Sequence, residues 1–206
     1  MPEKVDLRKQ LKAYYTASAK EPNIIDVPAF SFLCIDGQGN PASDPAYSEA
    51  VSVLYSAAYT LKFAVKKELE IDYTMMGLEG LWWMADGSIV SDLNKDSWSW
   101  TMMILQPEWV TQDRLDATLA ELRRKKPQPR LEDLRLERYH EGLAVQLLHI
   151  GAYTEEHENI MRMHQYAIRR GHVLTGKHHE IYLSDPRRTP AEKLKTILRQ
   201  PIARVE

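Results

Sequence analysis

The sequence is poor in cysteine, in net charge and in long apolar runs, and each absence excludes a class of protein. Its single cysteine, Cys34, excludes an internal disulfide and favours a reducing compartment. The 27 basic and 29 acidic residues give a net charge of −2, which favours neither nucleic acid nor an anionic membrane surface. No apolar stretch approaches the roughly 20 residues of a membrane helix, and the charged segment MPEKVDLRKQ lacks the apolar core of a signal peptide. We therefore expect a cytoplasmic protein with no nucleic-acid or membrane partner.

Common catalytic and cofactor motifs are missing as well. There is no G-x-S-x-G or P-loop pattern, and the DGQG segment at 36–39 is more typical of a turn than of a dinucleotide fingerprint. His157 and His164 lie seven positions apart on an expected helix, or about 10 Å at 1.5 Å per residue, which is too far to share a metal. His178 and His179 are neighbours on an expected strand and point to opposite faces. We expect neither a metal nor a cofactor.

The aromatic residues and histidines are unevenly distributed. All five tryptophans fall between positions 82 and 109, and all seven histidines follow residue 139. Neither bias is needed to build a hydrophobic core, so both regions are candidates for a site.

The pattern of apolar residues predicts an alternation of strands and helices. Asp44 and Pro45 are suited to the N-cap and first position of a long amphipathic helix, and Thr111 and Thr154 are suited to cap two more. Strands are indicated by apolar runs that end at Gly, Pro or Asp. The expected helices cover 44–70, 111–126 and 154–170, with a helical turn at 189–192; the expected strands cover 27–39, 73–84, 97–106, 134–153, 178–185 and 194–202, and a polar loop spans 85–96.

The two halves of this order resemble each other. CIDGQG corresponds to LHIGAY, WWMAD to IYLSD, and MMILQP to TILRQP, in the same sequence order. An internal duplication follows, and two βαββ units side by side predict an α+β fold with an antiparallel sheet and helices on one face. We expect a lead-in at 1–27 and a single domain at 28–206, with repeat one at about 28–108, a linking helix at 111–126 and repeat two at about 131–206.

Strand alternation sorts the side chains of these strands into two faces. Ile181 and Leu183 most simply pack under a helix, which sends His178, Glu180 and Tyr182 to an open face. Trp98, Trp100, Met102 and Ile104 form one stripe, and Trp82 with Met84 opposes Glu79 with Trp83. Two interpretations remain for each feature: the tryptophan and methionine stripe is either core or the lining of a pocket, and Glu180 is either a solvated strand residue or a pocket carboxylate.

Several longer segments carry a resemblance to a known family. LEGLWW, SDLNKD, WTMMILQP, EGLAVQLLHIGAYTEEHENIMRM and KHHEIYLSDPRRTPAEKLKTILRQPI are together similar to the GyrI-like small-molecule-binding family. More narrowly, they resemble its stand-alone branch, which includes cyclopropanoid cyclopropyl hydrolases. The similarity runs from about Phe30 to Pro201.

The resemblance implies tandem βαββ repeats around a pseudo-twofold axis, with an aromatic-lined ligand pocket where the units meet. It places the family's ligand-binding glutamate on Glu180. A carboxylate among aromatic rings is partly desolvated, which makes it a better proton acceptor near neutral pH. With Glu180 as the catalytic base, we expect Tyr153 and Tyr182 to assist it. From strand alternation, the expected ligand-binding residues are Glu79, Trp82, Trp98, Trp100, Met102 and His178.

Two functional classes remain open after the resemblance. In the first, the protein hydrolyses cyclopropane-bearing genotoxins by adding water, with Glu180 as general base. In the second, it only binds and sequesters drug-like amphiphiles. A third possibility, the ligand-sensing module of a transcription regulator, needs a DNA-binding domain; the first 27 or so residues are too few for one, so another chain would have to supply it. Either class implies a hydrophobic or cationic aromatic small molecule as ligand, and a monomer or weak homodimer.

Overall fold

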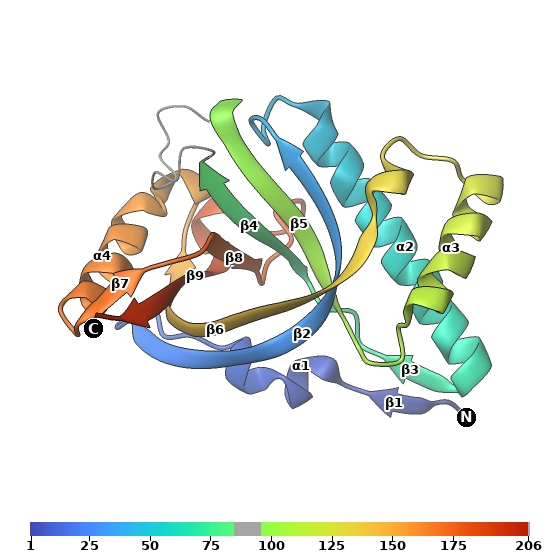
Figure 1. The fold of residues 1–206 in the computed structure, drawn as a ribbon, viewed down its shortest axis with the longest axis horizontal. Helices are drawn as coiled ribbons and strands as arrows, with labels where there is room; N and C mark the ends of the chain where they lie inside the picture. Colours follow the sequence, from blue (N-terminus) through green and yellow to red (C-terminus); the bar gives the residue numbers. More distant parts are fainter. Residues whose placement is uncertain (85–95, 206) are drawn as a thin grey trace.

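Six strands of the computed structural model, which describes residues 1–84 and 96–205, form a closed, barrel-like antiparallel sheet (Figure 1). Their order is β6-β2-β5-β4-β8-β9, and the sheet closes because β9 also pairs with β6. The short β7 (His172–Leu174) pairs beside the end of β9, and β1 (Glu3–Val5) pairs in parallel with β3 (Ile71–Tyr73). The bounds of the six strands are Asn23–Gln38 for β2, Leu78–Met84 for β4, Trp98–Gln106 for β5, Arg135–Ile150 for β6, His178–Tyr182 for β8 and Lys195–Arg204 for β9.

The pairing pattern of the first half of the sheet is repeated in the second half. β2 pairs with β5 and β5 with β4, just as β6 pairs with β9 and β9 with β8. The two halves join through β2–β6 and β4–β8, so each junction brings together equivalent strands. The predicted α+β fold with an antiparallel sheet of tandem βαββ units is confirmed, whereas the closure of the sheet was not predicted.

Two of the long helices begin where a capping side chain bonds one of the first amide groups. In α2 (Pro45–Leu69) the Asp44 carboxylate accepts from the Ala46 amide at 2.8 Å, and in α3 (Gln112–Lys125) the Thr111 hydroxyl accepts from the Arg114 amide. The helix expected at 154–170 is shorter: α4 covers His157–Ile168, because Tyr153–Glu155 forms a separate 3₁₀ turn. A short α1 (Leu7–Gln10) lies near the N-terminus, and further 3₁₀ turns cover Lys12–Tyr14, Leu131–Asp133 and Ala191–Lys193.

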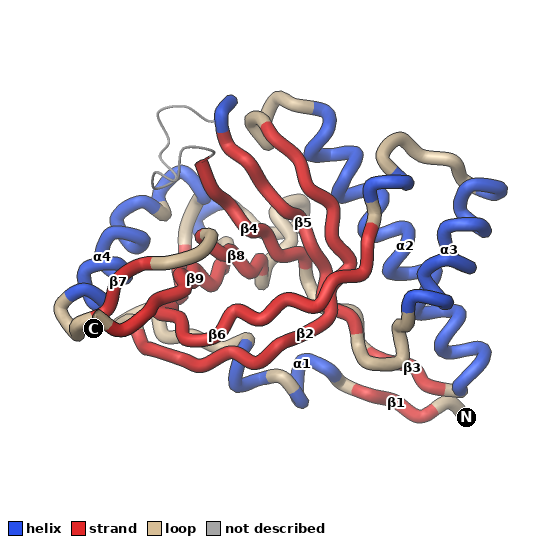
Figure 2. The backbone as a smooth tube through the Cα atoms, viewed as in Figure 1, coloured by secondary structure: helices blue, strands red, loops and turns tan. Residues whose placement is uncertain are grey.

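The long helices α2 and α4 lie outside the closed sheet, at its two ends, and α3 lies beside α2 (Figures 1 and 2). Tyr47 of α2 contacts Trp82 of β4, and Trp82 lines a pocket together with Ile160 of α4, so both helices cover the same face. No helix in the described ranges is long and apolar enough to cross a bilayer.

Contrary to the prediction from the sequence, the structure does not place Glu180 on an open face of the sheet. His178, Glu180 and Tyr182 lie on the helix-bearing face of β8, because the opposite face is the interior of the closed sheet. Ile181 points into that interior and is 1% exposed, whereas Leu183 follows the end of the strand and is exposed. The expected loop at 85–96 lies almost entirely outside the described residues.

Candidate functional site

A pocket of about 520 Å³ lies between α4 and strands β4 and β8, on the helix-bearing face of the sheet. Its wall combines aromatic rings with titratable groups from both halves of the chain. Among the residues that line it are Trp82, Trp83, Met84, Trp98, Tyr153, Glu156, His157, His164, His178, Glu180 and Gln200. Such a mixture of large apolar surface and a few convergent polar groups is typical of a small-molecule site.

Glu180 lies in the middle of β8, opposite Gly80 of β4, and its side chain is 15% exposed. The Tyr182 hydroxyl donates to Glu180 Oε2 at 2.8 Å, and the Trp82 indole Nε1 donates to the Tyr182 oxygen at 3.2 Å. A Cβ atom at Gly80 would lie 2.8 Å from Trp82 Nε1 and 3.2 Å from the Tyr182 hydroxyl. The glycine therefore leaves the space in which this hydrogen-bonded chain forms.

The phenols around Glu180 are held in their neutral form. Burial, reinforced by the Glu180 carboxylate, raises the pKa of Tyr182 well above its ordinary value. Burial likewise raises the pKa of Tyr153 to about 12, with added contributions from Glu156 and Glu180. A neutral phenol can donate a hydrogen bond to a carboxylate, whereas a phenolate would repel it. The neutral Tyr182 therefore holds Glu180 in one orientation.

The aromatic rings at the pocket pack edge to face in two pairs. The Trp82 and Trp98 rings lie 5.4 Å apart at 71°, and the Tyr153 and Tyr182 rings lie 5.7 Å apart at 78°. Beside them, the Lys177 ammonium lies 3.4 Å from the centre of the Trp83 ring. Edge-to-face rings of this kind present π surfaces that bind flat or cationic ligands.

The structure brings together most of the residues expected at the site. Glu180, Tyr153, Trp82, Trp98 and His178 line the pocket. Tyr182 lies immediately behind Glu180, to which it is hydrogen-bonded.

Three of the expected ligand-binding residues lie elsewhere. Trp100 is fully buried against Tyr47 of α2, with ring centroids 5.5 Å apart, and Met102 is fully buried in the same core. Glu79 is 1% exposed and points into the interior of the sheet, away from the pocket. Trp98 and Trp100 share one face of β5. The part of this face at Trp100 is covered by α2, whereas the part at Trp98 borders the pocket.

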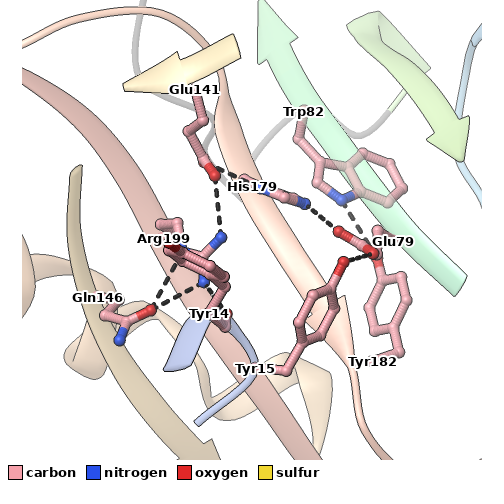
Figure 3. Close-up of polar contacts among 9 residues, drawn as sticks. All are labelled: Tyr14, Tyr15, Glu79, Trp82, Glu141, Gln146, His179, Tyr182 and Arg199. Carbon is pink, nitrogen blue, oxygen red and sulfur yellow. Dashed lines mark hydrogen bonds and ion pairs between the residues drawn. The ribbon is translucent and has the colours of Figure 1, made fainter. Parts of the chain in front are cut away.

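Glu79 belongs to a network of buried charges inside the sheet (Figure 3). It accepts from the Tyr15 hydroxyl at 2.6 Å and from His179 Nε2 at 3.0 Å, and His179 Nδ1 lies 2.9 Å from Glu141. Burial alone would lower the pKa of His179, but the hydrogen bonds and charges of Glu141 and Glu79 raise it to about 9. The ring is therefore an imidazolium that donates from both nitrogens.

Arg199 continues this network from β9. Its Nη1 donates to Glu141 at 2.9 Å, and its other nitrogens donate to the Gln146 side chain and the Tyr14 carbonyl. Burial would raise the pKa of Glu141, but His179 and Arg199 lower it to about 2. The network connects the N-terminal segment to β8 and β9. It holds in place the interior face of β8, and Glu180 lies on the opposite face of the same strand.

Sequence reasoning missed this network. A signal was present, since His179 alternates with Glu180 and Arg199 interrupts the apolar run TILRQPI. Its partners Tyr15 and Glu141 lie far away in the sequence and could not be paired with it without the fold.

The candidates for a metal or a nucleophile are weak. No three His, Cys, Asp or Glu side chains of residues 1–84 and 96–205 form a group that could hold a metal ion. Cys34 is 2% exposed, and burial raises the pKa of its thiol to about 12. A thiol of that pKa is not ionised near neutral pH, so it is a poor nucleophile.

Comparison with known proteins identifies the family. The model of the GyrI-like small-molecule-binding domain matches residues 20–203, and the chain belongs to this family. No functionally curated protein matches it.

Solved structures from Listeria innocua are similar over almost the whole chain. An uncharacterised conserved protein is 38% identical and covers 97% of this chain and 100% of its own, with a TM-score of 0.89. Two structures described as hydrolases are each 36% identical. One covers 97% of this chain and 100% of its own, with a TM-score of 0.84. The other covers 98% of this chain and 100% of its own, with a TM-score of 0.87.

Proposed function

We propose that this protein binds flat aromatic molecules that carry an electrophilic cyclopropane ring and hydrolyses that ring, with Glu180 as general base. The observation that carries the proposal is the hydrogen-bonded chain from Trp82 through Tyr182 to Glu180, which presents an oriented carboxylate to an aromatic pocket. The 36% identity to proteins described as hydrolases supports an enzymatic role.

The proposed reaction adds one water across one carbon–carbon bond. Glu180 takes a proton from a water molecule. At the same time the water oxygen attacks a ring CH₂ group, and a carbon–oxygen bond forms. The adjacent ring bond breaks, and its electrons move into a conjugated carbonyl group, which becomes a phenolate and then a phenol. The proton lost by water balances the proton gained by the product, so no oxidant, reductant or cofactor is consumed.

The aromatic wall would position such a substrate. Trp82 and Trp98 offer π faces for stacking, and Tyr153 lies beside Glu180 as the expected positioning phenol. The pocket would hold the ring carbon next to the oriented carboxylate and its water. The reactants then lose less translational and rotational entropy in the transition state, which lowers the activation free energy.

The test compares Glu180→Gln with wild type on a spirocyclopropyl-dienone alkylating compound, with mass spectrometry for the gain of one water. Glutamine keeps the shape but not the basicity, so turnover should fall by about 10²–10⁴-fold. Binding of an analogue that lacks the cyclopropane ring should change little. Glu158→Gln, an exposed residue in the first turn of α4, is the matched control and should turn over like wild type.

Two results would contradict the proposal. Wild-type protein that binds the compound but leaves its ring intact is a binding protein only. Glu180→Gln protein with undiminished turnover would show that another group activates the water.

A further inference from the structure

His178 lies on the same face of β8 as Glu180, two residues before it, and lines the same pocket. It is 7% exposed, and its Nε2 atom lies 3.7 Å from Glu180 Oε1. Neither of its ring nitrogens has a hydrogen-bond partner of good geometry in the described part of the chain. Its neighbour His179, on the other face of the strand, bonds a carboxylate with each nitrogen. A buried imidazole without a partner is unusual, because buried polar groups are normally hydrogen-bonded.

The separation of 3.7 Å between His178 Nε2 and Glu180 Oε1 is too long for a direct hydrogen bond. It is short enough for one water oxygen to lie at a normal distance of about 2.8 Å from both atoms. A buried water needs two to four polar partners, and the same wall offers further groups in His164 and Gln200. The place between His178 and Glu180 therefore has the polar lining that an ordered water requires.

The charge state of His178 decides what it can do for such a water. Burial, together with the nearby His164 and His179, lowers the pKa of His178 to about 3. The ring is therefore neutral near pH 7, with one nitrogen that donates and one that accepts. The Gln200 side chain lies within hydrogen-bonding reach of the ring and partly opposes this lowering. Only a neutral ring can accept a hydrogen bond from water, since an imidazolium has no acceptor.

We propose that His178 and Glu180 together hold the water that attacks the cyclopropane ring. This inference rests on the proposed hydrolysis. His178 accepts a hydrogen bond from one O–H of the water, and Glu180 accepts from the other O–H and removes that proton during attack. The two contacts fix both hydrogens, so a lone pair of the water oxygen points towards the ligand. His178 keeps its own protonation state, and the net reaction remains the addition of one water.

The first test is a crystal structure of the wild-type protein at a resolution that shows ordered water. A water oxygen should lie within hydrogen-bond distance of both His178 Nε2 and Glu180 Oε1, and it should be absent in His178→Leu. A wild-type structure with no ordered water between the two side chains would overturn the inference without touching the proposed function.

The second test is kinetic and uses three variants. His178→Leu should lower kcat by about a hundredfold, the effect expected when a reacting group is misplaced by about 1 Å. Its affinity for the analogue that lacks the cyclopropane ring should stay close to that of wild type. His178→Gln, whose amide oxygen can accept in place of Nε2, should recover part of the lost turnover. His140→Leu, at an exposed position on β6 outside the pocket, should behave like wild type.

The outcomes separate this inference from the proposed function. Full turnover by His178→Leu, with turnover lost in Glu180→Gln, refutes the role of His178 alone. Absence of turnover in wild type refutes the proposed function and the catalytic role of the water together. Thermal melting of each variant shows whether a loss reflects unfolding, and His178→Gln keeps the test valid when His178→Leu is unstable.

Discussion

The buried charge network predicts a loss of stability at mildly alkaline pH. The pKa of His179 rises from an ordinary 6.5 to about 9 in the folded protein. At about 1.4 kcal/mol per pH unit, this difference corresponds to roughly 3 kcal/mol of free energy of unfolding. Because the folded pKa is the higher one, the stabilisation is present in full below pH 6.5 and is lost as the pH rises towards 9.

Between pH 7 and 8 other buried groups contribute little, and Cys34, whose thiol pKa is raised to about 12, adds to the loss of stability only near pH 9. The pKa of His178 is lowered to about 3, so its ring is neutral in the folded chain throughout, and in the unfolded chain it becomes neutral once the pH exceeds about 7. The pKa of Glu141 is lowered to about 2, so its carboxyl group is ionised throughout this pH range in both states. The shifts of Glu141 and His179 describe one shared interaction, and their free energies are therefore not added.

Urea unfolding at pH 6, 7, 8 and 9, followed by tryptophan fluorescence, measures the effect. Wild-type stability should fall by roughly 2 kcal/mol between pH 7 and 9. Glu141→Gln should be about 3–5 kcal/mol less stable at pH 6, because it leaves Arg199 without its carboxylate. The same variant should show a flatter pH dependence, because its His179 loses the main cause of the raised pKa.

The matched control is Glu132→Gln, which removes an exposed carboxylate that bonds Arg123 through both oxygens. An exposed ion pair contributes little, so this variant should keep the wild-type pH dependence. Wild-type stability that stays constant from pH 6.5 to 9, or an unchanged slope in Glu141→Gln, would refute the assignment of a charged His179.

Three further predictions concern the pocket. Tyr182→Phe removes the donor to Glu180, so turnover should fall while the affinity for an unreactive analogue stays near wild type; equal turnover in a steady-state assay would contradict this. Gly80→Ala should lower turnover similarly, because its Cβ would displace the Tyr182 hydroxyl or the Met102 side chain, and a crystal structure would show the shift. Trp98→Ala should weaken binding of flat aromatic ligands with little effect on the melting temperature, whereas Trp100→Ala should cost about 3–5 kcal/mol in urea unfolding.

The sequence was most informative where local chemistry decides the structure. Asp44 followed by Pro45, and Thr111 before an amphipathic run, predicted the starts of two helices because a cap depends only on nearby residues. Strand alternation also placed Glu180 and Tyr182 on the same face and His179 on the other. Thr154 was wrong as a cap, because Tyr153–Glu155 forms its own turn before α4 begins.

The sequence pattern could not predict which residues far apart in the chain contact each other. Alternation showed that Glu79 points away from Trp82, but not that the other face is a closed interior holding Tyr15 and His179. The same limit applies to Trp100, whose spacing equals that of Trp98 and whose burial depends on Tyr47 of α2. Closure of the sheet decides which of two chemically similar faces meets a ligand.

The contact between Arg199 and the Tyr14 carbonyl joins residues 185 positions apart. Pairings of such high contact order form slowly, because the chain loses loop entropy before it gains the contacts. During synthesis β9 leaves the ribosome after all the strands that it joins, so β6 and β8 present unpaired edges until that moment. Until then Glu141 also lacks its ion-pair partner Arg199. A strand made after both of its partners therefore completes the barrel and adds Gln200 to the wall of the pocket, and a nascent chain stalled shortly before β9 would be prone to aggregation.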